Sequence, residues 1–118
     1  MRKLEIGVGG VDKAATDFLK TVRSLERGAR VRTREQLYFS DMPTLLKTLT
    51  GERWRLIEHL NRAGPQSINA AAQQLGRNYK NVHGDVKRLM ETGLVERLDD
   101  GRIRVPFSSI ITKLKMAA

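Results

Sequence analysis

The sequence contains no cysteine, only two histidines and few aromatic residues, and the shortage of cysteine and histidine argues against several classes of function. Without cysteine there is no disulfide framework, no thiolate nucleophile and no cysteine zinc site. His59 and His83 fall on different predicted helices, and no HExxH or similar metal-ligating spacing occurs. No nucleophile-elbow sequence surrounds any serine. We therefore expect a protein that is not an enzyme and that uses neither a metal nor a cofactor.

Long apolar runs are also missing. No run approaches the roughly 18 residues of a membrane span, and the first residues, MRKLEIGVGGVDK, lack the apolar core of a signal peptide. We expect a soluble, cytoplasmic protein that does not bind membranes. The run GVGGVDKAA lacks the third glycine and the Gly-Lys-Ser/Thr ending of a phosphate loop, which disfavours nucleotide binding.

Positive charge, in contrast, is abundant. The chain has 22 Lys and Arg residues against 13 Asp and Glu residues, a net charge of +9 over 118 residues. Such an excess favours a polyanion as partner, with nucleic acid ahead of an acidic protein. The length suits one small domain with an extension. The basic residues are spread along the chain, so charge alone does not locate the site.

Residues 1–40 predict a strand-helix-strand element. The run KLEIGV alternates polar and apolar residues and ends at glycines, and the period changes to two again over residues 29–39. Between these strands an apolar helical stripe suits either pairing across a homodimer axis or packing on the second strand. Arg30, Arg32 and Arg34 share one strand face, which would contact phosphate or an acidic toxin, or simply be a solvated edge.

Residues 41–107 predict a winged helix-turn-helix, which makes the fold class α+β. A short helix capped by Ser40 or Asp41 precedes a helix in GERWRLIEHLNRAG. A short helix after Ser67, a turn at Gly76 and a longer helix over residues 78–92 follow. The segment LVERLDDGRIRVPF has the turn chemistry of a hairpin. Residues 108–118 read as a C-terminal tail.

The long helix separates into two faces at 100° per residue. Its apolar side is expected to carry Tyr79, Val82, Val86, Leu89 and Met90. Arginine, lysine and asparagine on the other side suit base edges and phosphates, although the simplest alternative is a solvated face. We predict that Arg77, Lys80, Asn81 and His83 reach base edges and that Lys87 and Arg88 reach phosphate. The predicted DNA-binding residues of this segment are Arg77, Asn78, Lys80, Asn81, His83, Gly84, Lys87 and Arg88.

The hairpin predicts a wing that carries Arg97, Arg102 and Arg104 around the tip Asp99-Asp100-Gly101. Arginines of a wing can contact phosphates or a minor groove. Because the two tip aspartates would repel DNA, we expect contact through the flanks of the hairpin.

Residues 51–106 resemble the MarR-like winged helix-turn-helix family of prokaryotic transcriptional regulators. The resemblance rests on this whole segment, on the motif NVHGDVKRLMETGLVE within it and on YFSDMPTLLKTLT upstream. It implies a cytoplasmic, dimeric DNA-binding regulator, and it also implies an antitoxin as an alternative. The family more often has arginine at the position of Gly84, so the resemblance implies one DNA contact fewer here.

The sequence therefore predicts a sequence-specific regulator that binds double-stranded DNA as a homodimer and represses by occupying a promoter. One alternative is an antitoxin that neutralises a toxin protein and represses their shared promoter. Another is a winged helix that contacts RNA or protein. Because Tyr79 is expected on the buried side, the long helix would lack an exposed aromatic for stacking on single-stranded RNA.

Overall fold

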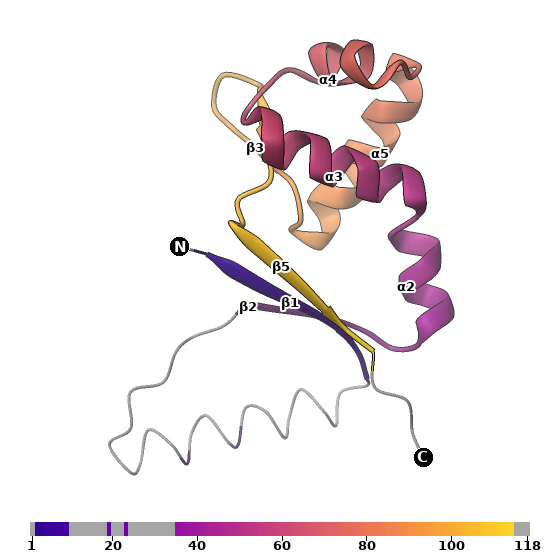
Figure 1. Cartoon of the computed structure of the whole chain (residues 1–118), viewed down its shortest axis with the longest axis vertical. Coiled ribbons are helices and arrows are strands. Elements are labelled where there is room, and N and C mark those ends of the chain that lie inside the picture. The colour runs from indigo at the N-terminus through magenta and orange to yellow at the C-terminus, as the bar shows by residue number, and fades with distance from the viewer. Residues whose placement is uncertain (1, 10–18, 20–22, 24–34, 115–118) are drawn as a thin grey trace. The chain divides into compact units, whose positions relative to one another are not determined.

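The computed structural model of the chain describes residues 2–9, 19, 23 and 35–114 (Figure 1). Helices and strands are mixed within these residues, which confirms the α+β class. The elements in chain order are β1 (Lys3–Val8), β2 (Glu35–Phe39), α2 (Met42–Thr48), α3 (Gly51–Ala63), α4 (Ile68–Leu75), α5 (Tyr79–Thr92), β3 (Glu96–Arg97), β4 (Ile103–Arg104) and β5 (Ser109–Lys113).

The chain divides into two compact units. One contains the described residues up to Lys47 together with those from Ser109 onward, and the other runs from Thr48 to Ser108. The sequence pattern placed the first boundary at residue 41, where helical periodicity begins. The structure instead groups nearly all of α2 with the strands. The point where the sequence pattern changes from strand to helix is therefore not the point where one unit ends and the other begins.

A parallel sheet of order β2-β1-β5 organises the first unit. Ile6 at its centre pairs with Leu37 on one side and Thr112 on the other. Leu4 and Ile6 are both buried because alternate residues of a strand point to the same face. Parallel strands require crossover connections, and the connection from β2 to β5 contains the whole second unit.

The segment expected as a tail contains a strand. Residues Ser109–Lys113 form β5, which pairs in parallel with β1. Isoleucine and threonine favour an extended chain in this segment, but its partner strand lies far away in the sequence, so local patterning does not reveal the pairing. The helix expected between β1 and β2 and the face of Arg30, Arg32 and Arg34 lie outside the described residues.

The unit from Thr48 to Ser108, which we call the helical unit, packs α3, α4 and α5 around one core, and a hairpin of β3 and β4 closes this core. Gln66, between α3 and α4, adds a third member to this hairpin because it exchanges two backbone hydrogen bonds with Ile103, of 2.8 and 3.1 Å. The core side chains with 2% exposure or less are Leu49, Leu56, Leu60, Ala71, Ala72, Val82, Val86, Leu89, Leu94, Val95 and Ile103.

Side-chain caps set the starts of these helices. Thr50, Ser67 and Asn78 each accept a hydrogen bond from a backbone N–H in the first turn of α3, α4 and α5. Gly76 and Gly93 end α4 and α5 in the left-handed conformation, with φ of 64° and 82°. The helix bounds expected from the sequence for this unit are therefore confirmed, and their cause is local.

A substitution of Gly76 should reveal the cost of that conformation. Gly76→Ala is expected to lower the free energy of unfolding by about 1 kcal/mol, because a Cβ strains the left-handed region. Gly84→Ala is the matched control, since this glycine lies inside α5 with open space at its Cβ position. That change should instead stabilise the unit by about 0.5 to 1 kcal/mol. Urea unfolding of both variants would show the opposite signs, and equal effects would contradict this account.

Candidate nucleic-acid interface

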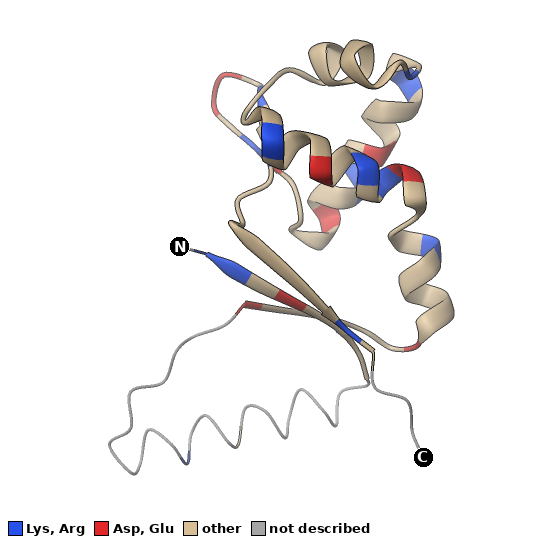
Figure 2. Cartoon of the chain, in the orientation of Figure 1, with Lys and Arg blue, Asp and Glu red and all other residues tan. Residues whose placement is uncertain are grey.

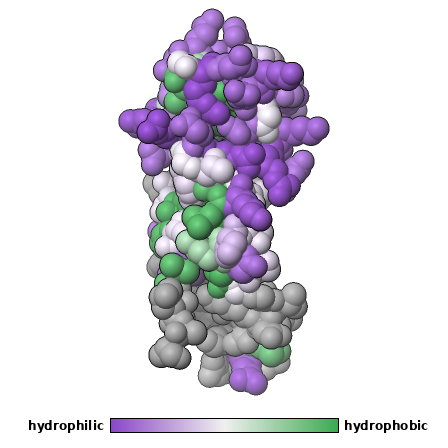
Figure 3. All heavy atoms as spheres, turned by 90° about the vertical axis from the view of Figure 1, so that its right-hand side faces the viewer, coloured by the Kyte–Doolittle hydropathy of each residue, from purple (hydrophilic) through white to green (hydrophobic). Residues whose placement is uncertain are grey.

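The unit from Thr48 to Ser108 shows a mainly hydrophilic surface on the face seen in the upper part of Figure 3. Basic and acidic residues nevertheless alternate along α3, as Figure 2 shows. Net charge therefore does not single out one helix, and the geometry of individual side chains has to identify the interface.

Helix α5 has a buried stripe and a polar exposed face. Val82, Val86 and Leu89 form the stripe, with 1% exposure or less. The predicted separation into two faces is thus confirmed for the middle of the helix. The exposed residues of the polar face are Lys80, Asn81, Gly84, Lys87, Arg88 and Glu91.

Two residues expected on the buried side of α5 are exposed, so that expectation was wrong. Tyr79 keeps 50% of its surface accessible and Met90 keeps 36%. At about 100° per residue they lie roughly 60° and 80° from Val82, at the edge of the stripe. The ring of Tyr79 is 5.9 Å from that of His83, between centroids. The first turns of α5 therefore do present an aromatic side chain to solvent.

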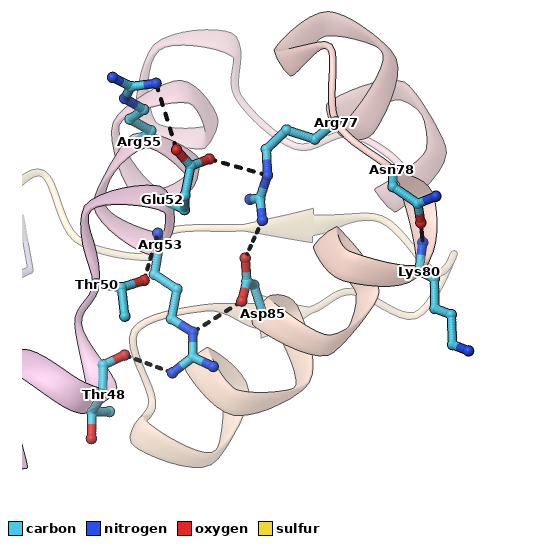
Figure 4. A network of polar contacts seen from close by, with 9 residues as sticks. All are labelled: Thr48, Thr50, Glu52, Arg53, Arg55, Arg77, Asn78, Lys80 and Asp85. Carbon is cyan, nitrogen blue, oxygen red and sulfur yellow. Dashed lines mark hydrogen bonds and ion pairs between the residues drawn. The ribbon is translucent and has the colours of Figure 1, made fainter.

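A network of charged side chains joins α5 to α3 (Figure 4). Asp85 of α5 accepts a hydrogen bond from Arg53 Nε at 3.0 Å through one carboxylate oxygen and from Arg77 Nη2 at 2.7 Å through the other. These three side chains are only 16 to 20% exposed. Arg77 Nε also lies 3.2 Å from a carboxylate oxygen of Glu52. Because each oxygen of the Asp85 carboxylate accepts a hydrogen bond from an arginine, the network fixes one side of α5 against α3.

This network changes the interpretation of Arg77. We predicted a base contact for it, but its guanidinium lies largely buried between Asp85 and Glu52, and its Nη1 atom is buried without a hydrogen-bond partner among the described residues. Arg77 thus points into the protein. Sequence reasoning also missed Asp85, whose only signal is that it is the one acidic residue among the first twelve residues of a basic helix.

Arg53 extends the network to the start of the unit. Its Nη1 donates to the backbone carbonyl of Thr48 at 2.8 Å, while its own N–H donates to the Thr50 cap. The guanidinium of Arg53 therefore joins the last residue of α2 to the middle of α5, while its backbone N–H bonds to the cap of α3.

The arginines of the hairpin differ in their partners. Arg102 lies 2.7 Å from Asp100, and Arg104 lies 2.6 Å from Glu96. Hydrogen bonds from the backbone N–H and then the guanidinium of Arg102 hold the pKa of the Asp100 carboxyl below its ordinary value, so Asp100 stays charged. Arg97 of β3 is exposed and makes no ion pair with any residue that the structure describes. Of the three predicted wing arginines, Arg97 is therefore the one whose guanidinium could bind an anion without first breaking an ion pair within the described residues.

Other predicted positions have simpler surroundings. Asn78 uses its side chain to cap α5, where it accepts from the N–H of Lys80 at 2.8 Å. Arg88 pairs with Glu91 at 2.7 Å on the exposed face. His59 lies 2.7 Å from the side-chain oxygen of Gln66. No group of three metal-ligating side chains occurs in the described part of the chain, and none of its helices is long and apolar enough to cross a membrane.

These features define a small α+β protein whose helical unit, closed by a hairpin, exposes a basic helix face. Residues 48–112 match the HVO_A0114 family, and the chain belongs to that family. The match begins at Thr48, where the helical unit begins, and extends into β5. No curated protein and no solved structure matches the chain.

Proposed function

We propose that the protein is a transcriptional regulator that reads double-stranded DNA with α5. The order of α3, α4, α5 and hairpin supports a winged helix-turn-helix, in which α4 braces α5 and the hairpin is the wing. The pairing of Gln66 with Ile103 ties the hairpin to the segment between α3 and α4, which gives the wing a fixed root.

The observation that carries this proposal is the availability of polar groups on α5. Lys80, Asn81 and Lys87 are exposed, and their side chains form no ion pair with any described residue. The carboxylate of Asp85, the one acidic residue among the first twelve of α5, instead accepts hydrogen bonds from Arg53 and Arg77, and that of Glu91 lies 2.7 Å from Arg88. The helix thus presents amide and ammonium groups that suit base edges and phosphates.

A homodimer is part of this proposal. Two copies would place their α5 helices in successive major grooves about 34 Å apart, which requires two related half-sites about 10 bp apart, or a multiple of that spacing. Occupation of such an operator would exclude other proteins from the promoter, so the regulator would act as a repressor.

The test is selection from a random duplex library at about 0.15 M salt, followed by comparison of two variants. Asn81→Ala should relax sequence preference, because it removes a side chain suited to an adenine edge, whereas Lys87→Ala should weaken all duplexes alike. Lys3→Ala, an exposed lysine in β1, is the control for loss of one positive charge. Absence of an enriched motif, or an unchanged preference in Asn81→Ala, would overturn sequence reading by α5.

Exposure of Tyr79 beside His83 favours a second candidate, a module that binds single-stranded nucleic acid. An accessible aromatic ring can stack on a base without regard to sequence. Single-stranded DNA and RNA should therefore be included as competitors in the same experiment. Competition stronger than that of the selected duplex would favour this second candidate over the duplex reader.

A further inference from the structure

A hollow of about 510 Å³ lies within the helical unit, between α5 and the start of the hairpin. The lining residues from α5 lie on successive turns of that helix. Part of the wall is apolar because it is formed by the buried Val86 and by Met90. It is an open surface feature bounded by two elements of the same unit. The lining residues are His83, Val86, Lys87, Met90, Glu91 and Arg97.

The charges around this hollow are not balanced by the protein itself. Lys87 from α5 and Arg97 from β3 line it without an acidic partner among the described residues. Glu91 lines it too, but its carboxylate lies 2.7 Å from the guanidinium of Arg88. Two free cations on two elements, with an acid already paired beside them, form a site suited to an anion.

We propose that this hollow holds one phosphodiester group of the DNA backbone, gripped between Lys87 and Arg97. The proposal rests on the function proposed above. If α5 lies in the major groove, a phosphate strand that borders the groove passes along the flank of the helix, and the flank that carries Lys87 faces Arg97 across the hollow. The apolar wall suits the C–H groups of the adjoining sugar.

The same reasoning gives the other hairpin arginines a smaller part. Arg102 and Arg104 are each paired with an acid of the hairpin, so the binding of a phosphate would have to compete with Asp100 or Glu96. Arg97 has no such competitor. The hairpin would therefore contact the backbone at its root strand β3, close to α5, and fix the register of the helix in the groove.

A scan with single methylphosphonates tests this directly, because each substitution makes one phosphate of the selected duplex neutral. Wild-type protein should lose about three- to tenfold in affinity at one position per half-site. Lys87→Ala and Arg97→Ala should each lose part of that factor on unmodified DNA and should each be less sensitive than the wild type to the methylphosphonate at that position, and the double variant should not be sensitive to it. Lys3→Ala should keep the full sensitivity of the wild type.

A change at Glu91 should act in the opposite direction. Glu91→Gln removes the negative charge that lines the hollow and should tighten duplex binding about two- to threefold without a change in sequence preference. All of these side chains are exposed, so the thermal midpoints should match that of the wild type.

The possible outcomes separate the two proposals. If the wild type binds no duplex, the proposed function fails. If it binds a selected duplex but Arg97→Ala retains wild-type affinity and methylphosphonate sensitivity, only the phosphate site is overturned. Loss of sensitivity in Lys87→Ala but not in Arg97→Ala would also overturn it, because the phosphate would then be held from α5 alone.

Discussion

Asp85→Ala should lower the free energy of unfolding of the helical unit by about 3 kcal/mol. The change leaves Arg53 and Arg77 largely buried without the carboxylate that accepts a hydrogen bond from each of them. The cost exceeds the loss of the pair itself, because each guanidinium stays largely removed from water while N–H groups that Asp85 satisfied lose their acceptor. Only the contacts of Arg53 with the Thr48 carbonyl and of Arg77 with Glu52 remain. Urea unfolding followed by circular dichroism measures the loss, and the slope with denaturant should stay unchanged.

The control for Asp85 is Glu91, an acid on the same helix whose partner Arg88 is as close as those of Asp85 but solvent-exposed. Glu91→Ala should change the free energy of unfolding by less than about 0.5 kcal/mol, since exposed ion pairs contribute little. Asp85→Asn should fall between the two, because it keeps an oxygen acceptor and loses the charge. A cost for Asp85→Ala no larger than that for Glu91→Ala would show that the network does not hold α5 in place.

Leu89→Ala should also destabilise the unit by about 3 kcal/mol. Leu89 has no exposed surface, and its carbonyl accepts hydrogen bonds from the N–H groups of Leu94 and Val95 after the helix ends. Removal of its side chain opens a cavity in the core beneath α5, and the surroundings can fill that space only in part. Thermal and urea unfolding should agree on the size of the effect.

The neighbouring residue Met90 provides the matched comparison. It occupies the next position on α5 but is 36% exposed, so Met90→Ala removes fewer buried atoms and should cost about 1 kcal/mol or less. If the two variants lost the same stability, the boundary of the buried stripe would lie elsewhere on the helix.

The helices of the helical unit could be predicted from the sequence because the residues that start and end them act locally. Thr50, Ser67 and Asn78 are capping residues that act within three positions of themselves, and Gly76 and Gly93 adopt the left-handed conformation where helices end. Periodic apolar residues then identify the face that packs. No knowledge of distant residues is needed for any of these steps.

Strand β5 could not be found in this way, because pairing partners leave no local signal. Ile110 lies opposite Leu4 of β1, a residue near the other end of the printed sequence. Tyr79 was misplaced for a related reason. Helical periodicity gives the angle of a side chain around α5, but it does not say where on that circle the neighbouring helices cease to cover it.

The sequence predicts which helix face forms the candidate site, but it does not predict which of the charged side chains there form ion pairs within the protein. The exposed face of α5, including Lys80, Asn81 and Lys87, follows from helical geometry. Whether an arginine in or just before α5 can contact DNA depends on which acidic side chains lie beside it in the fold. The pairing of Arg77 with Asp85 and Glu52 shows this. Interactions of this kind depend on tertiary structure, which one-dimensional patterning does not contain.

The connection of the sheet has a consequence for the order of folding. Strand β5 can join β1 only after the chain has passed through the whole helical unit, so the helices, whose contacts are close in sequence, should form first. The entropy lost in closing the sheet depends on the chain between β2 and β5, and a folded insert has far fewer conformations to lose than a free loop of that length. Completion of the sheet is therefore thermodynamically coupled to the folding of the helical unit through the covalent chain.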